Sequence, residues 1–203
     1  MKLAFLFPGQ GSQAVGMGAS LADAFASARE VFAEVDDALS QKLSVLMREG
    51  PEDQLTLTEN AQPALMVVSV AAARALKTEF GIEISSADYV AGHSLGEYSA
   101  LCAAGAISLA DTARLLKLRG QAMQRAVPVG QGAMASLIGP KTDLALAEAA
   151  AKAGSEVGVC VVANDNNAGN LVISGDKAAV DRASEIAPAA HRAEYSPSEW
   201  PAT

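Results

Sequence analysis

A glycine–serine–glycine pattern in the middle of the chain constrains the fold more than any other feature. Gly92, Ser94 and Gly96 form the pattern G-x-S-x-G, which places a serine on a tight turn between a strand and a helix. A short apolar run, residues 89–91, precedes the pattern, and small and apolar residues follow it over 95–104. Glycines let the strand and the helix approach closely. The serine hydroxyl then lies at a helix N-terminus, where backbone N–H groups can bind an anion.

The pattern by itself leaves two interpretations open. Ser94 is either a nucleophile or an ordinary serine in a strand-to-helix turn, because such a short motif also occurs by chance. The wider sequence has to decide between them.

The segment around Ser94 and several spaced motifs resemble one protein family. Residues 92–101, Gly-His-Ser-Leu-Gly-Glu-Tyr-Ser-Ala-Leu, resemble the active-site segment of the malonyl-CoA:acyl carrier protein transacylases and the related acyltransferase domains of polyketide synthases. The other matching motifs come in the family's order: Phe7-Pro8-Gly9-Gln10-Gly11-Ser12-Gln13, Gln62-Pro63-Ala64, Leu118-Arg119-Gly120, Asn164 and Val172-Ile173-Ser174-Gly175. The resemblance runs from the first residue to about residue 182.

The resemblance implies an α/β fold. We expect an acyltransferase-type, α/β-hydrolase-like core with an inserted ferredoxin-like subdomain, incomplete at the C-terminus. The predicted boundaries are residues 1–127 for the core, 128–190 for the subdomain and 191–203 for a divergent tail. In the subdomain the sequence predicts, in order, a strand (133–138), a helix (142–152), a strand (157–163), a turn run (164–169), a strand (170–174) and a helix (176–187). This is the ferredoxin-like order without its last strand.

In the core, the pattern predicts a buried strand over residues 3–7. Apolar residues at helical spacing predict one helix over 21–39 and a short helix over 43–47. Pro63 is expected at the first position of a helix that is buried over 64–80. Asp36-Asp37 is expected on a solvated face, and Ser108-Leu109-Ala110-Asp111 fits a capping box at the start of a helix over 109–124.

The resemblance also implies a reaction. A malonyl group would pass from malonyl-CoA to the phosphopantetheine thiol of acyl carrier protein, in fatty acid biosynthesis and by a ping-pong route. Ser94 is the implied nucleophile, and the N–H groups of Gln10 and Leu95 are the implied oxyanion hole. From the residues alone, the Gln10 loop is equally a Gly-rich turn after a strand.

Arg119 lies off the polar stripe of its helix, in a row with Leu115 and Ala122. An arginine there needs an anionic partner, because burying an unpaired charge is costly. Spacing alone favours a structural ion pair, with Glu97 as a candidate partner. In the resembled family the matching arginine holds the free carboxylate of the malonyl group, which a planar guanidinium binds bidentately.

Gln62 and both histidines need separate consideration. Gln62 is either a pocket residue that binds substrate or a polar group at a helix start. His93 directly precedes Ser94, a geometry that disfavours it as the base, and we assign it to the substrate-binding turn. His191 comes before the position where the family's catalytic histidine is expected. We expect it not to act as the base, which must lie within hydrogen-bond reach of the nucleophile.

The sequence after residue 187 departs from the family. No Val/Ile-rich strand can be read in residues 188–203, and Ser196-Pro197 is not followed by a histidine. We therefore expect a truncated or frame-shifted terminus, an unpaired sheet edge in the subdomain and a poor transacylase. The alternatives are an inactive member of the family, or another serine acyltransferase or thioesterase.

Composition excludes several other classes. The chain is 50% hydrophobic and 19% charged, which is typical of a globular protein. A net charge of −8 with scattered Lys and Arg argues against nucleic acid, and no stretch reads as a signal peptide or membrane span. Cys102 and Cys160 give neither a disulfide framework nor a metal spacing. We expect a cytoplasmic protein, monomeric when complete, without cofactor or metal. Its expected partners are malonyl-CoA and acyl carrier protein, which would dock near Arg114, Lys117 and Arg125.

Overall fold

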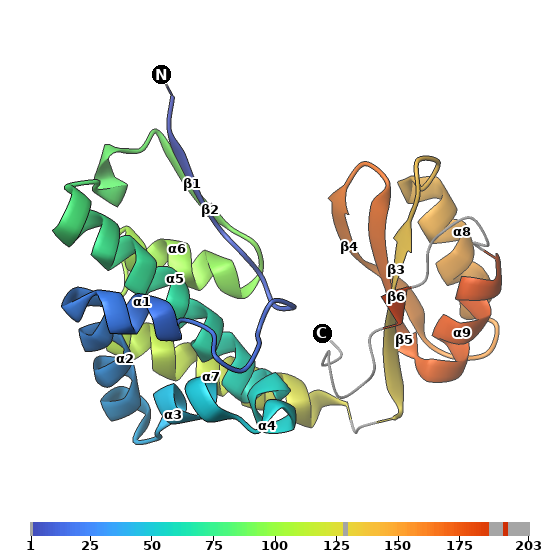
Figure 1. Cartoon of the computed structure of the whole chain (residues 1–203). Helices are drawn as coiled ribbons and strands as arrows, with labels where there is room; N and C mark the ends of the chain where they lie inside the picture. The colour runs from blue at the N-terminus through green and yellow to red at the C-terminus, as the bar shows by residue number, and fades with distance from the viewer. Residues whose placement is uncertain (1, 128–129, 187–192, 195–203) are drawn as a thin grey trace. The chain divides into compact units, whose positions relative to one another are not determined.

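The computed structural model describes residues 2–127, 130–186 and 193–194. Contacts divide the chain into two compact units, Met1–Gln121 and Ala122–Thr203 (Figure 1). The elements of the first are β1 (Ala4–Phe7), α1 (Ala19–Ala24), α2 (Ala26–Leu39), α3 (Leu43–Glu49), α4 (Glu52–Thr56), α5 (Thr58–Phe80), a 3₁₀ turn (Ile84–Ser86), β2 (Tyr89–Gly92), α6 (Leu95–Ala103) and α7 (Leu109–Ala126). The mixed α/β class that the sequence predicted is confirmed.

Two short parallel strands carry the serine turn. β1 pairs with β2 from Ala4 opposite Tyr89 to Phe7 opposite Gly92. Side chains alternate along a strand, so one face packs against helices: Phe7 is buried with Ala73 of α5 and Ala100 of α6. On the other face Leu6 is 77% exposed and Tyr89 60% exposed. The expectation of a fully buried strand over residues 3–7 is therefore wrong for one of its two faces.

Helix α5 forms the centre of the core of the first unit. Its Met66 and Val67 are buried together with apolar side chains from the helices around it: Val31 and Val35 of α2, Leu43 of α3, Leu95 of α6 and Leu116 of α7. The predicted buried helix is confirmed from Ala64 to Ala75, and its last turn, which includes Phe80, is exposed. The residues that flank the serine turn are thus anchored on a packed helical layer.

The helix predicted over residues 21–39 is two helices. Phe25 has extended backbone angles, φ −124° and ψ 124°, and separates α1 from α2. The guanidinium of Arg29 donates hydrogen bonds to the carbonyl oxygens of Ala22, at 2.6 Å, and Asp23, at 3.2 Å. A side chain thus satisfies carbonyls that a continuing helix would have bonded. Apolar periodicity persists across the break, which is why the sequence did not reveal it.

Helix α5 begins earlier than predicted. It starts at Thr58, so Pro63 lies inside the helix and not at its first position. A proline within a helix loses one backbone hydrogen bond. Side chains outside the helix hold the preceding turn: Lys117 donates to Asn60, and Gln121 donates to Glu59. Tertiary contacts therefore override the local signal.

Asp36 is also placed differently from the prediction. It is 7% exposed, and its carboxylate accepts hydrogen bonds from the backbone N–H and the hydroxyl of Ser44 at 2.8 and 2.6 Å. An anion at the first turn of α3 also interacts favourably with the helix dipole. Of the pair, Asp37 is the exposed member.

The second unit is a sheet packed against two helices. Its elements are β3 (Gly132–Ile138), α8 (Leu144–Gly154), β4 (Cys160–Asn167), β5 (Asn170–Asp176), α9 (Lys177–Ile186) and β6 (Ala193–Glu194). The strands lie in the order β4-β5-β3-β6, with each neighbouring pair antiparallel. Alanines of both helices pack on Leu137, Leu171 and Ile173 of the sheet. This is the ferredoxin-like arrangement.

Two expectations for this unit are wrong. The run 164–169 is not all turn, because β4 continues through Asn167 and only residues 168–169 make the turn. The last strand is present as β6, whose two residues pair with Ala135 and Ser136 at the edge that was expected to be open. A two-residue strand with no apolar run carries no sequence signal of its own. The predicted boundaries at 127, 128 and 190 stay predictions.

Candidate active site

Ser94 lies on a strained turn between β2 and α6. Its backbone angles are φ 55° and ψ −115°, and it is the N-cap of α6. A non-glycine residue at such angles costs energy, and strain of this kind concentrates at functional sites. Ser94 is exposed on this turn. Its geometry is that of a nucleophile on a strand-to-helix elbow.

The two glycines of the pattern have a steric cause. A Cβ on Gly92 would lie 1.9 Å from the carbonyl oxygen of Gly96, and one on Gly96 would lie 2.3 Å from that of Phe7. Both clashes are with backbone atoms, which cannot move away as a flexible side chain can. The elbow thus brings β1, β2 and α6 together at Ser94.

Arg119 of α7 lies beside the serine. Its guanidinium donates to the Ser94 hydroxyl at 3.1 Å and to the side-chain oxygen of Gln62 at 2.7 Å. Gln62 is fully buried. The guanidinium carbon is 6.0 Å from the ring centre of Tyr98, within cation–π range. Within the described residues no carboxylate pairs with Arg119, so the alternative of an ion pair with Glu97 is not what the structure has.

The loop after β1 lies on the same site. The side-chain amide of Gln10 donates to the hydroxyl of Thr58 at 3.2 Å. Gly9 lies against the ring of His93, because a Cβ on Gly9 would be 2.6 Å from His93 Nδ1. The backbone N–H of His93 donates to the carbonyl oxygen of Phe7 at 3.0 Å. His93 therefore packs against the loop that contains Gln10.

Leu95 completes the set of predicted residues. It is the first residue of α6 and its side chain is buried. The N–H at this position has no helix carbonyl to bond, and the helix dipole is positive there. Together with the Arg119 guanidinium, the α6 N-terminus makes the surroundings of Ser94 favourable for negative charge. Such surroundings stabilise an oxyanion and bind a carboxylate.

The structure thus brings Ser94, Leu95, Arg119 and Gln62 together, with Gln10 on the adjoining loop after β1 and His93 in the serine turn itself, packed against that loop. His191 lies outside the described residues. Sequence reasoning missed contributing residues: Thr58, Tyr98 and Gly120. Tyr98 and Gly120 lie within motifs quoted for the family and Thr58 lies shortly before one, but their contacts join separate elements of the fold and leave no pattern in the sequence.

No group of three or more His, Cys, Asp or Glu side chains among the described residues is arranged to hold a metal ion. None of the helices described is long and apolar enough to cross a membrane.

Comparison with known proteins identifies the family. Residues 4–195 match the acyl transferase domain. The chain belongs to the acyl transferase domain family. It is 48% identical over 186 residues to a malonyl CoA-acyl carrier protein transacylase of Bacillus subtilis, covering 92% of this chain and 57% of the relative. It is 46% identical over 189 residues to the Escherichia coli protein of the same name, covering 93% of this chain and 60% of that one.

Comparison with solved structures points to the same group of proteins. The chain matches the crystal structure of an acyl-carrier-protein-S-malonyltransferase from Bartonella henselae with a TM-score of 0.87 and 57% identity, covering 93% of this chain and 59% of the other. It matches a malonyl-transacylase in complex with a type II PKS acyl-carrier protein with a TM-score of 0.86 and 43% identity, covering 95% and 61%. The chain spans about three fifths of the length of these relatives.

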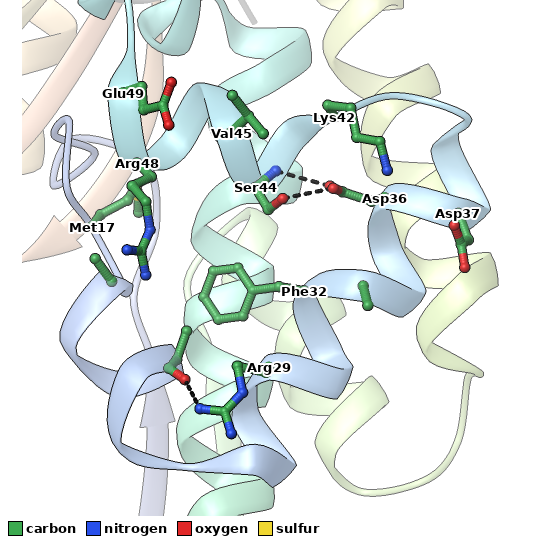
Figure 2. A pocket seen from close by; sticks show the side chains of 13 residues that line it. Met17, Arg29, Phe32, Asp36, Asp37, Lys42, Ser44, Val45, Arg48 and Glu49 are labelled. Carbon is green, nitrogen blue, oxygen red and sulfur yellow. Dashed lines mark hydrogen bonds between the residues drawn. The ribbon is translucent and has the colours of Figure 1, made fainter.

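A cavity of about 430 Å³ elsewhere in the first unit contains none of the site residues. It lies among α1, α2 and α3, with Phe32 in the middle of the view in Figure 2. The figure also shows the bonds from Ser44 to Asp36 and the bond from Arg29 to a carbonyl oxygen. Asp36 and Arg29, which line this cavity, are already paired within the fold.

Proposed function

We propose that Ser94 accepts a malonyl group from malonyl-CoA and passes it to the phosphopantetheine thiol of acyl carrier protein. The observation that carries this proposal is the Arg119 guanidinium, which lies 3.1 Å from the Ser94 hydroxyl and has no carboxylate partner among the described residues. A cation beside the nucleophile suits an acyl group that itself bears a negative charge. The names of the relatives support the same reaction.

The chemistry of the first half follows from the site. The Ser94 oxygen attacks the thioester carbonyl carbon and gives up its proton to a base. The negative charge on the carbonyl oxygen is stabilised by the N–H groups of Leu95 and Gln10. The C–S bond then breaks, the coenzyme A thiolate leaves and takes a proton, and a malonyl ester remains on Ser94.

The second half reverses these steps with a different thiol. The phosphopantetheine thiol loses its proton and attacks the ester, the bond to Ser94 breaks, and the serine oxygen is protonated again. A histidine base is expected from the family resemblance. We assign no base among the described residues, since the His93 ring lies against Gly9.

In this proposal Arg119 binds the malonyl carboxylate. In a malonyl ester the carboxylate carbon lies only about 2.5 Å from the ester carbonyl carbon, as two C–C bonds require. It is therefore within reach of a guanidinium that contacts the Ser94 oxygen. An acetyl group lacks this carboxylate. We expect Arg119 to favour malonyl over acetyl by about 1.5–3 kcal/mol, or roughly 10- to 150-fold.

The remaining expectations belong to the same proposal. The reaction uses a serine, amides, an arginine and a base, so we propose no cofactor or metal.

Acyl carrier proteins are acidic and this chain is itself acidic, so docking needs a local basic patch. Of the three cations nominated for it, Lys117 already bonds Glu59 and Asn60 and Arg114 already pairs with Asp111, whereas Arg125 is exposed. The free thiols of Cys102 and Cys160 accord with a reducing cytoplasm.

The test is to incubate the purified protein with malonyl-CoA and locate the adduct by peptide mass spectrometry. The expected adduct is on Ser94 and absent from Ser94→Ala. Acyl carrier protein should then remove it as a malonyl thioester. Labelling elsewhere would refute the assignment, and release to water alone would indicate a thioesterase.

Arg119→Ala tests the carboxylate interaction, with Arg114→Ala as the matched control on the same helix. Arg114 bonds Asp111 and the Ala38 carbonyl, not the site. Arg119→Ala should lose most of its preference for malonyl-CoA over acetyl-CoA, and Arg114→Ala should keep it. Equal losses with both substrates would mean that Arg119 is structural.

A further inference from the structure

Hydrogen bonds from two parts of the site converge on the first turn of α5. We call residues 58–62 the entry turn. The Gln10 side chain donates to Thr58 Oγ1 at 3.2 Å, and Arg119 donates to Gln62 Oε1 at 2.7 Å. Thr58 is 3% exposed and Gln62 is fully buried. The loop expected to supply an oxyanion amide and the arginine expected to bind the carboxylate are thus fastened to one helical turn.

Helix α7 is fastened to the same turn by neighbours of Arg119. Lys117 Nζ donates to Asn60 Oδ1 at 2.8 Å and lies 3.4 Å from Glu59 Oε2. Gln121 Nε2 donates to the same Glu59 oxygen at 3.2 Å. These side chains lie one helical turn or less on either side of Arg119. They fix both the rotation and the axial position of the helix that carries it.

Gly120 makes the closest contact between the two helices. A Cβ there would lie 2.5 Å from Glu59 Cα, 2.7 Å from Glu59 N and 2.7 Å from the Thr58 carbonyl oxygen. Every one of these atoms is backbone, so no side chain can move to make room. Ordinary contact begins at 3.4 Å. An alanine at Gly120 would therefore push α7 away from the entry turn and would displace the backbone of Arg119 with it.

We propose that the entry turn positions the acylation site through two separate connections. Thr58 holds the Gln10 loop, and Glu59 together with Gly120 holds Arg119. Thr58, Glu59 and Gly120 are positioning residues, since none of them touches Ser94. The inference rests on the proposed malonyl transfer and extends it, because it states which residues control the common step and which control the choice of acyl group.

The two connections predict different kinetic effects. Stabilisation of the oxyanion is needed for every acyl group, so a change at Thr58 should slow malonyl and acetyl transfer to Ser94 by the same factor. Recognition of the carboxylate concerns malonyl alone, so changes at Glu59 or Gly120 should lower the malonyl-to-acetyl ratio. Misplacement of a reacting group by about 1 Å can cost on the order of 100-fold in rate.

The experiment measures single-turnover rates of Ser94 acylation by malonyl-CoA and by acetyl-CoA. Thr58→Val removes the hydroxyl at nearly constant volume and should reduce both rates about equally, by roughly 3- to 10-fold, while Thr58→Ser should keep them. Gly120→Ala should lower the malonyl-to-acetyl ratio by on the order of 10-fold or more. Glu59→Gln adds no atoms to the packed contact. It should lower the malonyl-to-acetyl ratio by a few-fold, because it weakens the interaction of residue 59 with Lys117.

Glu34→Gln is the matched control. It breaks the ion pair of Glu34 with Arg74 of α5, away from the entry turn, and should leave both rates and their ratio unchanged. If Gly120→Ala does not fold, Glu59→Gln decides.

The inference is overturned if Thr58→Val changes the ratio, or if Glu59→Gln and Gly120→Ala slow both substrates equally. If the unaltered protein is not malonylated at Ser94, the proposed function fails and the inference fails with it. If the protein is malonylated but the variants show no such split, only the inference fails.

Discussion

Replacing Ser94 with glycine should leave the protein more stable than replacing it with alanine, while both replacements abolish acylation. The backbone at Ser94, φ 55° and ψ −115°, lies outside the regions that residues with a Cβ adopt readily. Such conformations cost roughly 1–3 kcal/mol. Glycine relieves that cost but loses about 0.5–1 kcal/mol through the greater freedom of the unfolded chain. The expected net gain over alanine is therefore between about 0 and 2.5 kcal/mol.

The comparison has to be made with Ser94→Ala and not with the unaltered protein. Both variants lose the hydroxyl and its hydrogen bond with Arg119, so the difference between them isolates the Cβ. Urea unfolding followed by far-UV circular dichroism measures this difference. In a thermal scan each kcal/mol corresponds to about 2–4 °C for a chain of this size.

Ser40 supplies a control for positive φ alone. It has φ 48° and ψ 37°, which lie in the allowed left-handed region. The gain of Ser40→Gly over Ser40→Ala should therefore be smaller than the gain at Ser94. If Ser94→Gly is no more stable than Ser94→Ala, the elbow stores no strain and the reasoning is wrong.

Three further predictions concern packing and the thiols. Gly96→Ala should destabilise the first unit by at least about 2 kcal/mol in urea, because its Cβ meets the Phe7 carbonyl oxygen at 2.3 Å. Leu116→Ala should cost about 2–5 kcal/mol, since Leu116 is fully buried in the core around α5. Burial raises the pKa of the Cys102 and Cys160 thiols, so both should react more slowly with a thiol reagent in the folded protein than in urea.

Each of these predictions has its own check. Gly105→Ala meets no atom within 4 Å and introduces only the strain of an alanine at a φ of 80°, so it should cost less than Gly96→Ala. Leu118→Ala removes an exposed side chain and should change stability by less than about 0.5 kcal/mol. As the pH rises, the two thiols lose their protons at a lower pH in the unfolded chain than in the folded protein. The free energy of unfolding should therefore fall above about pH 8.5. A rise there would contradict the direction of both pKa shifts.

The sequence by itself determined the features that are local. The elbow follows from Gly92, Ser94 and Gly96, because only glycine fits where backbones touch. The hydrogen bond from the Asp111 N–H to the Ser108 hydroxyl forms as the capping pattern predicted. The alternation of strands and helices in the second unit follows from short apolar runs and their turns. Each of these signals lies within a few consecutive residues.

Only the tertiary structure decided which distant residues meet. Spacing favoured an ion pair for Arg119, yet in the structure the guanidinium bonds Gln62 and Ser94, which come from other elements of the fold. The early start of α5 at Thr58 and the short strand β6 have the same origin. Each is stabilised by a partner far away in the chain, and such partners leave no periodic trace in the sequence. Local patterns therefore located Ser94 on its elbow, while the packing of α7 on α5 placed the charge of Arg119 beside it.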